Sequence, residues 1–356
     1  MSAVSPLFGF DPPDLTLDEA LAIAQRHWGV DGSPRRLRGE RSNNTCITGP
    51  NGRAFVLHVL GAGDDAAVVD LQTRAMFHLE RRVPDVPVPR VVPTPGGELL
   101  AEVGVGGRTC LARLVTFLPG TTFDPGERLA TDAYRRIGRL IGRIAAGLAD
   151  FEHPAAAHFM PWDVANGLVV DARMRAGLTR SSVEALRSID HRLDAMAELV
   201  ASLPRRLVHN DGHAGNLVRS DAASQDVSGV IDFGDLVHTV TAADVAIIAE
   251  SFAPDHPQPD EVVAAVTAGY HAEVALTDAE FAAIPELVLA RTALNVLLAE
   301  HQIRHAPHLA AAAQANLAEV TERLVRWSEL DRDAMIARTH QAIGDARSSD
   351  STEVAP

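Results

Sequence analysis

The chain contains few aromatic residues and few cysteines. Aromatic side chains make up 4% of its 356 residues, so its core has to be built from aliphatic side chains. Cys46 and Cys110 lie far apart in the sequence, which excludes a disulfide framework and a cysteine-rich metal site. There is no run of about 18 uninterrupted apolar residues, and residues 1–10 lack the features of a signal peptide. We therefore expect no membrane-spanning segment and a cytoplasmic location.

Positive charge is also in short supply. Lysine and arginine together number 32 against 47 aspartate and glutamate residues, which gives a formal net charge of −15. A nucleic-acid binder needs a basic surface that displaces counterions from phosphates, and an anionic membrane selects basic segments in the same way. The composition therefore predicts neither nucleic acid nor a membrane as a partner. It is compatible with a small cationic molecule.

The first third of the sequence predicts a small mixed sheet with one helix packed on it. Thr16 and Glu19 form a capping box that opens a preceding helix. The Asn51-Gly52 pair predicts a hairpin turn that leads into an apolar strand, Ala54–Leu60. Helical spacing of apolar residues follows over residues 64–82. Further strands are expected within residues 34–47 and at residues 99–103 and 108–117.

After Pro119 and Gly120 the pattern becomes mainly helical, and we place a domain boundary there. The predicted parts are residues 1–118, residues 119–345 and a polar, serine-rich tail at residues 346–356 that we expect to be disordered. Helices are predicted at about residues 137–148, 182–203, 242–252, 259–271, 278–305 and 309–327. Short strands are predicted at residues 206–208, 216–218 and 227–231.

Two short motifs carry the chemistry. Residues 209–218 read HNDGHAGNLV, and residues 229–235 read GVIDFGD. Asp211 and Asn216 fall on one loop between strands, and Asp232 ends the next strand, so a short hairpin brings all three to one rim. Phosphoryl transfer needs a carboxylate that accepts the proton of the attacking hydroxyl and oxygen ligands for Mg²⁺. Two alternatives remain: simple turn-forming residues, or a metal hydrolase that uses His209, Asp211 and His213.

The spacing resembles the kinase signature of a His-x-Asp-x-x-x-x-Asn loop followed by Asp-Phe-Gly. It is similar to the aminoglycoside phosphotransferase and choline kinase superfamily, and within it to hydroxylysine kinase and the kinase domains fused to class III aminotransferases. Besides the two motifs, the resemblance rests on residues 39–44, 70–72, 89–94, 113–120, 153–154 and 162–163. It extends over residues 17–327.

That resemblance implies an α+β, protein-kinase-like fold with two lobes. Residues 1–118 would form an N-lobe that covers the nucleotide, and residues 119–345 a C-lobe that carries catalysis and the acceptor site. Asp211 would be the catalytic base, Asn216 and Asp232 would hold Mg²⁺, and ATP or GTP would be the co-substrate. The implied activity is O-phosphorylation of an amine-bearing metabolite, a hydroxylated amino acid first and an aminoglycoside-like antibiotic second.

One position departs from the family pattern. The family places a lysine for the nucleotide phosphates in the strand that here reads FVLHVL, and His58 stands at that position. Imidazole is mostly neutral at pH 7 and supplies no full charge unless its pKa is raised. His58 is one candidate phosphate ligand, and Arg38 or Arg41 in the neighbouring turn is another. The third alternative is a nucleotide- or ligand-binding pseudokinase without turnover.

The remaining candidates form two groups. Ser42, Asn43 and Asn44 supply the polar side chains of the turn that would cover the phosphates, and they join His58 and the turn arginines as nucleotide ligands. Candidates for the acceptor side follow from the resemblance and from sequence position: Asp235, Trp162, Asp163 and Arg291. For Asp235 and Asp163, helix capping is the structural alternative.

Overall fold

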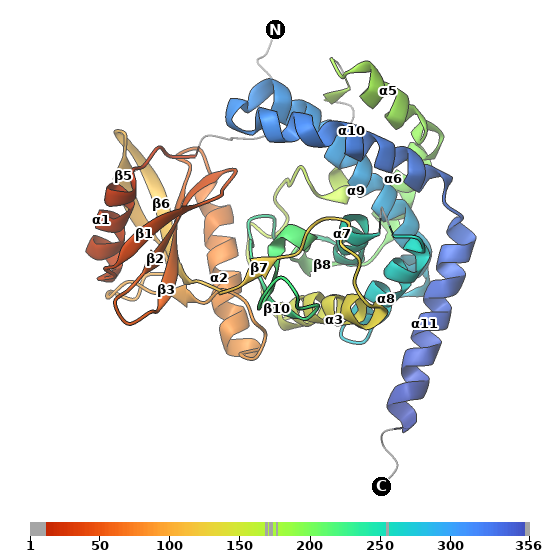
Figure 1. The fold of residues 1–356 in the computed structure, drawn as a ribbon, viewed down its shortest axis with the longest axis horizontal. Coiled ribbons are helices and arrows are strands. Elements are labelled where there is room, and N and C mark those ends of the chain that lie inside the picture. Colours follow the sequence, from red (N-terminus) through yellow and green to blue (C-terminus); the bar gives the residue numbers. More distant parts are fainter. Residues whose placement is uncertain (1–11, 168–169, 171–173, 176, 254–255, 353–356) are drawn as a thin grey trace. The chain divides into compact units, whose positions relative to one another are not determined.

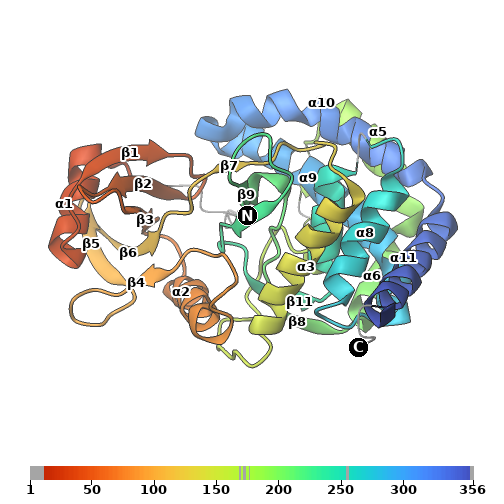
Figure 2. The same cartoon turned by 60° about the horizontal axis from the view of Figure 1, so that its bottom comes forward.

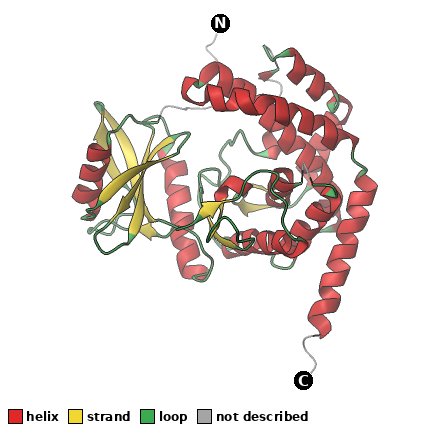
Figure 3. Cartoon of the chain, viewed as in Figure 1, coloured by secondary structure: helices red, strands yellow, loops and turns green. Residues whose placement is uncertain are grey.

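The computed structural model describes residues 12–167, 170, 174–175, 177–253 and 256–352 (Figure 1). The chain divides into two compact units. The N-terminal unit comprises Met1–Pro119 together with Phe151–Ala156, and the C-terminal unit comprises Gly120–Asp150 together with Ala157–Pro356. Strands dominate the first unit and helices the second (Figure 3).

The N-terminal unit is a six-stranded sheet with two helices. The sheet has the order β1-β2-β3-β6-β4, with β5 paired to β6, and every pair is antiparallel. Its helices are α1 (Leu17–Trp28) and α2 (Ala66–Arg82). Its strands are β1 (Ser33–Leu37), β2 (Ser42–Thr48), β3 (Ala54–Leu60), β4 (Val91–Val92), β5 (Ala101–Val105) and β6 (Arg108–Thr116).

The two faces of this sheet have different surroundings. Alternate residues of a strand point to opposite faces. On one face, Ile47, Leu57 and Leu114 are fully buried in an aliphatic core with Ala20 and Ala24 of α1. The other face is covered by α2, and Figure 1 shows α1 and α2 on opposite sides of the sheet. The polar residues described below belong to the α2 side.

The C-terminal unit is a helical bundle with two small sheets, β10-β9-β7 and β11-β8. Its strands are β7 (Thr121–Thr122), β8 (Arg205–Val208), β9 (Leu217–Arg219), β10 (Val227–Val230) and β11 (Val237–Val240). Its helices are α3 (Thr131–Gly147), α5 (Arg180–Arg187), α6 (Leu193–Ser202), α7 (Ala243–Phe252), α8 (Pro259–His271), α9 (Asp278–His305), α10 (Pro307–Glu329) and α11 (Arg332–Thr352). Three short 3₁₀ turns are η1 (Val164–Asn166), η2 (Asp190–Arg192) and η3 (Ala214–Asn216).

Helices α3 and α8 lie side by side (Figure 2) because glycines let their backbones approach. A Cβ atom at Gly138 would stand 2.1 Å from the carbonyl oxygen of Val266, and one at Gly269 would stand 1.9 Å from that of Arg135. Real Cβ atoms do not approach backbone oxygens so closely, so both positions require glycine. Helix α3 also packs against the loop that carries Asp211, where a Cβ atom at Gly212 would stand 3.2 Å from Cδ1 of Ile141.

Helix α9 is the central helix of this unit. It is long and apolar enough to cross a membrane by length and composition, but 83% of its most apolar window is buried inside the protein. Its apolar residues, such as Leu287, Val288 and Leu294, are therefore core residues. This buried position also fixes the polar residues of α9, Arg291 among them, inside the unit.

Several predicted elements are confirmed. The capping box of Thr16 and Glu19 opens α1, and Ala54–Leu60 is β3. Helices α8 and α9 have the predicted bounds. The sheet is antiparallel throughout and not mixed, because its neighbouring strands are linked by hairpins and returning segments without a parallel crossover.

Two other predictions differ from the structure. The helix predicted over residues 182–203 is interrupted: α5 ends at Arg187, where the Ser188 hydroxyl bonds the Ala185 carbonyl and competes with the helical pattern. The tail was expected to be disordered from residue 346, whereas α11 continues to Thr352. The segment after Gly344 contains no glycine or proline before Pro356 that would end a helix. Residues 353–356 lie outside the described part of the chain.

Candidate active site

The centre of the site is the loop between β8 and β9. Asp211 is partly buried, with 17% of its side chain exposed. The amide Nδ2 of Asn216 donates to Asp211 Oδ2 at 2.7 Å and to the Asp211 carbonyl at 3.0 Å. The sequence placed both residues on one loop, and the structure shows that they are in direct contact. Asn216 thereby fixes the orientation of the carboxylate.

The β9–β10 hairpin brings Asp232 to the same end of the strands. The Ile231 amide donates to the Asn216 carbonyl at 2.9 Å, which ties the two motifs together. Asp232 is exposed, and its Oδ1 accepts from the Gly234 amide at 3.0 Å. Because Asn216 uses its Nδ2 on Asp211, its amide oxygen is turned away from that carboxylate. One amide oxygen and one exposed carboxylate are hard ligands of the kind that Mg²⁺ prefers, so this pair fits the ion.

Each of the two motifs contains a residue in an unusual backbone conformation. Asn210 and Asp232 are the two non-glycine residues with positive φ among the described residues, at 61° and 64°. Such strain persists where surrounding structure enforces it, and it often marks functional sites. The Asn210 amide donates to Asp244 Oδ1 at 2.8 Å, and Asp244 is fully buried. Burial raises the pKa of Asp244 to about 7. Asp244 thereby anchors the start of helix α7 to the loop.

Arg291 of α9 makes a contact that the sequence did not predict. Its Nη2 lies 3.2 Å from Asp211 Oδ1, and its Nη1 donates to the Trp162 carbonyl at 2.7 Å. Arg291 is 4% exposed. Its guanidinium therefore links Asp211 to the segment before η1. This position favours an action through Asp211, and a direct contact of Arg291 with the acceptor stays a prediction.

Two histidines flank Asp211. His213 Nε2 lies 3.7 Å from Asp211 Oδ2. Burial, and then the charge of Arg291, lower the pKa of His213. His209 is fully buried and packs edge-on against Phe233 with ring centroids 4.7 Å apart. Burial lowers the pKa of His209 to about 4, so the imidazole is neutral at pH 7 and acts as a structural residue of the loop.

The acceptor-side candidates are mostly buried. Asp163 caps η1, where its Oδ1 accepts from the Ala165 amide at 2.9 Å and from Thr239 Oγ1 at 2.5 Å. Burial raises the pKa of Asp163. Asp235 is 4% exposed, and its charge acts on His209 and His213 of the loop. The placement of Asp163 agrees with the capping alternative. Helix capping by Asp235, and a direct contact of Asp163 or Asp235 with the acceptor, stay predictions.

In the N-terminal unit, a row of polar residues crosses three strands on the α2 side of the sheet. Asn44 of β2 pairs with His58 of β3, and His58 pairs with Arg113 of β6. Directly opposed residues of antiparallel strands share a face. Asn44 Oδ1 accepts from Ser42 Oγ at 2.8 Å and lies 2.8 Å from His58 Nδ1. Its Nδ2 donates to the Arg38 carbonyl at 3.1 Å.

These bonds define the chemical state of His58. Since Asn44 Nδ2 is used as a donor toward Arg38, its oxygen faces His58, so the imidazole proton is assigned to Nδ1. Burial, and then the charge of Arg113, lower the pKa of His58 to about 3. His58 is thus neutral at pH 7, and its Nε2 presents a lone pair instead of a proton.

The structure separates the other predicted nucleotide ligands. Asn43 faces away from Ser42 and Asn44, as the alternation of a strand requires, and its Nδ2 donates to the Pro13 carbonyl at 3.1 Å. Arg38 is exposed in the turn. Arg41 is partly exposed, and its charge acts on Asp64. The roles of these residues in nucleotide binding stay predictions.

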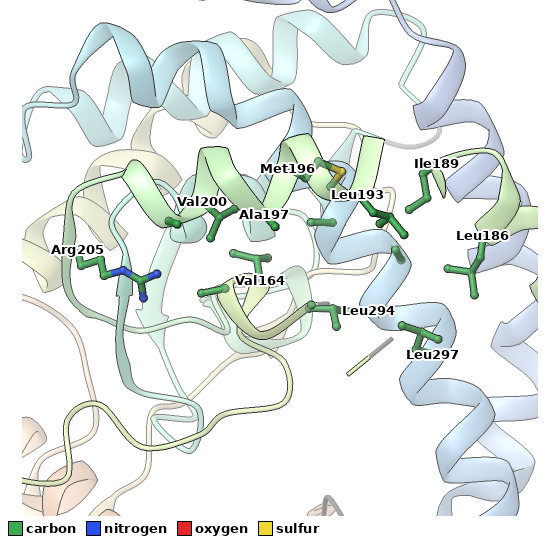
Figure 4. A pocket seen from close by; sticks show the side chains of 15 residues that line it. Val164, Leu186, Ile189, Leu193, Met196, Ala197, Val200, Arg205, Leu294 and Leu297 are labelled. Atoms are coloured by element: carbon green, nitrogen blue, oxygen red, sulfur yellow. The ribbon is translucent and has the colours of Figure 1, made fainter. Parts of the chain in front are cut away.

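The C-terminal unit also contains an apolar cavity of about 120 Å³ (Figure 4). Its walls come from α5, α6, η1 and α9, with Met196 and Val200 facing Leu294 and Val164. Of the described residues that line it, Arg205 alone is charged. None of the predicted site residues lines this cavity, so we do not assign it to phosphoryl transfer.

Comparison with known proteins assigns the class. Residues 33–287 match the phosphotransferase enzyme family, APH, and the chain belongs to this family. Hydroxylysine kinase from Danio rerio is 26% identical over 356 residues, which cover 93% of this chain and 96% of that protein. A microcompartment-associated aminopropanol kinase has a similar fold, with a TM-score of 0.69 and 20% identity over 87% of this chain and 98% of that one. An amicoumacin kinase in complex with AMP-PNP and Ca²⁺ has a TM-score of 0.68 and 17% identity, with coverages of 89% and 96%.

These matches confirm the predicted family and the α+β, protein-kinase-like fold. The protein is a phosphotransferase with a hydroxyl group as acceptor, and it is a small-molecule kinase. The alternative of a pseudokinase without turnover is not supported by the comparisons.

Proposed function

We propose that the protein transfers the γ-phosphoryl group of ATP or GTP to a hydroxyl of an amine-bearing small molecule, with a hydroxylated amino acid as the first candidate. The observation that carries this proposal is the double restraint on Asp211: Asn216 at 2.7 Å holds one carboxylate oxygen, and Arg291 at 3.2 Å holds the other. A carboxylate held at both oxygens is suited to act as a base in a fixed position.

In the proposed step, the acceptor hydroxyl donates its hydrogen bond to Asp211. The hydroxyl oxygen attacks the γ-phosphorus, the bond from that phosphorus to the β–γ bridging oxygen breaks, and the nucleoside diphosphate leaves. The hydroxyl proton passes to Asp211. The loose transition state needs little covalent help, so positioning and charge supply most of the rate enhancement.

Asn216 and Asp232 would hold Mg²⁺ in this proposal. The ion, when bound, would offset the negative charge that develops on the nucleotide phosphates. Asp232 is suited to this role because it is exposed and its positive φ, 64°, is fixed by the turn into Gly234. In the N-terminal unit, the turn with Ser42 and Asn44 would contact the nucleotide phosphates.

The acceptor is proposed from two observations. The relative named above is a hydroxylysine kinase that aligns over nearly the whole chain. The formal net charge of −15 favours a cationic substrate over an anionic one. A hydroxylated, amine-bearing acceptor satisfies both, and we further propose that the protein acts in the cytoplasm. Resistance to an aminoglycoside-like antibiotic is the competing role for the same site.

An acceptor panel tests this proposal. The purified protein is incubated with Mg²⁺ and ATP or GTP, and products are followed by mass spectrometry. Hydroxylysine is compared with lysine, which has the same amines and carboxylate but no hydroxyl, and with a set of aminoglycosides. Phosphorylation of hydroxylysine and not lysine supports the proposal. Phosphorylation of aminoglycosides alone assigns the antibiotic role, and no phosphorylated product with any hydroxylated amine contradicts the proposal.

A further inference from the structure

Kinases of this fold class place a lysine against the nucleotide phosphates and pair it with a carboxylate of the neighbouring helix. This chain contains no lysine at all: the 32 residues counted as lysine and arginine are all arginine. The positive charge cannot therefore come from a lysine elsewhere in the sequence. The charge has to come from histidine or arginine. This reasoning rests on the proposed function, since it assumes that the protein binds a nucleotide.

His58 stands at the lysine position but does not supply the charge. With its proton on Nδ1 and bonded to Asn44, the imidazole turns a lone pair at Nε2 toward any further partner. A lone pair repels a phosphate oxygen. Desolvation of the ring, and then the charge of Arg113, disfavour a second proton on Nε2.

Arg113 is a cation that lies beside His58 in the sheet. It is the direct cross-strand partner of His58 in the β3–β6 register, so both side chains leave the same face. An arginine also reaches farther from its strand than the imidazole does. A guanidinium keeps its charge at every physiological pH and binds phosphate in a planar, bidentate manner.

The partners of Arg113 place its charge between the sheet and α2. Its Nη1 donates to Gln72 Oε1 at 3.2 Å and to Thr73 Oγ1 at 3.3 Å. Both acceptors are neutral side chains of α2, and they hold the guanidinium beside that helix. Burial raises the pKa of Asp64, and the charge of Arg113 acts against that rise. Arg113 and Gln72 thus make the contact between strand and helix that a lysine and a carboxylate make in other kinases of this fold class.

We propose that Arg113 supplies the positive charge that binds the nucleotide phosphates, in place of the missing lysine. The cation has moved by one strand, from β3 to β6, and its helix partner is the neutral Gln72. His58 and Asn44 hold the turn at Ser42 in position and contribute no charge of their own.

The test compares nucleotide with nucleoside binding. Affinities for Mg²⁺-ATP and adenosine, and for Mg²⁺-GTP and guanosine, are measured by calorimetry on the full chain. Arg113→Met is expected to lose at least about tenfold in triphosphate affinity, because a charge-assisted bond to phosphate is lost. Its nucleoside affinity should stay within about twofold. Arg113→Lys should keep most of the preference for triphosphate over nucleoside.

Further variants control the test. Arg108→Gln changes an exposed arginine of the same strand and should leave both affinities unchanged. The double variant with His58→Lys and Arg113→Met should regain triphosphate affinity, because it restores a cation on the same face. If Arg113→Met does not fold, the Arg113→Lys and double variants still carry the test.

The inference is overturned if triphosphate affinity survives in Arg113→Met, or if nucleotide and nucleoside affinities fall together. It is also overturned if Arg41→Gln shows the selective loss and the Arg113 variants do not, or if the wild type binds no nucleotide. If phosphate binding depends on Arg113 but no acceptor is phosphorylated, the proposed function fails and this inference stands. If an acceptor is phosphorylated but the affinity for triphosphate does not depend on Arg113, the proposed function stands and this inference fails.

Discussion

Replacing Arg291 should separate the positioning of Asp211 from the stability of the fold. Arg291→Gln removes a guanidinium whose side chain is 5% exposed and which bonds Asp211 and the Trp162 carbonyl. Removing one partner of a fully buried ion pair costs about 3–5 kcal/mol. Asp211 keeps 17% exposure and its bond from Asn216, so we expect about 2–3 kcal/mol. Urea unfolding measures this loss.

The loss of activity in Arg291→Gln should be larger than the loss of stability explains. A carboxylate displaced by about 1 Å costs roughly 100-fold in rate, so kcat should fall by about that factor while the KM for nucleotide changes little. Arg291→Lys should restore part of kcat. Arg323→Gln is the matched control, since Arg323 is a 6% exposed arginine of α10 that pairs with Glu250 at 3.0 Å. It should lose stability with kcat within about threefold of wild type. A folded Arg291→Gln protein with near-normal kcat would refute the positioning role.

Three further outcomes follow from the site. Asp232→Asn should abolish the Mg²⁺-dependent part of the thermal shift produced by ATP or GTP; a shift that keeps its Mg²⁺ dependence counts against Asp232 as a metal ligand. The pKa of Asp244 is about 7 in the folded protein, whereas its ordinary value is 3.8. Between these two pH values the unfolded chain has already lost the proton that the folded protein keeps, so Asp244 lowers the free energy of unfolding as the pH rises from about 4 to about 7. Asp244→Asn should therefore gain stability relative to wild type between about pH 5 and pH 8, measured by urea unfolding, and an unchanged difference would contradict this. Because the pKa of His58 is about 3, its imidazole resonance, identified by its absence in His58→Gln, should not titrate between about pH 5 and pH 8; a midpoint near 6.5 would contradict the neutral assignment.

The central residues of the site could be predicted because they are close in sequence. Asp211 and Asn216 are five residues apart, and a single hairpin carries Asp232 to them. Local spacing and motif order are sufficient for such an arrangement. The capping box of α1 and the strand after the hairpin at Asn51-Gly52 were predictable for the same reason, since both are set by neighbouring residues.

The contacts of the arginines could not be predicted in this way. Arg291 is 80 residues from Asp211, and its contact depends on the rotational position of α9, which one sequence does not define. Arg113 is 41 residues from Gln72, and its place beside His58 depends on the β3–β6 register. The sequence alone shows that a cation is missing at His58. It does not show which arginine lies next to it.

The most direct test of the account is phosphoryl transfer from γ-labelled ATP or GTP to hydroxylysine by the wild type and by Asp211→Asn. The asparagine keeps the size of the side chain and the contact with Asn216 but cannot take the hydroxyl proton. The account predicts labelled acceptor with the wild type and a loss of about 100-fold or more with Asp211→Asn, while nucleotide affinity is retained. Equal transfer by both proteins would contradict the assignment of Asp211 as the base and, with it, the proposed active site.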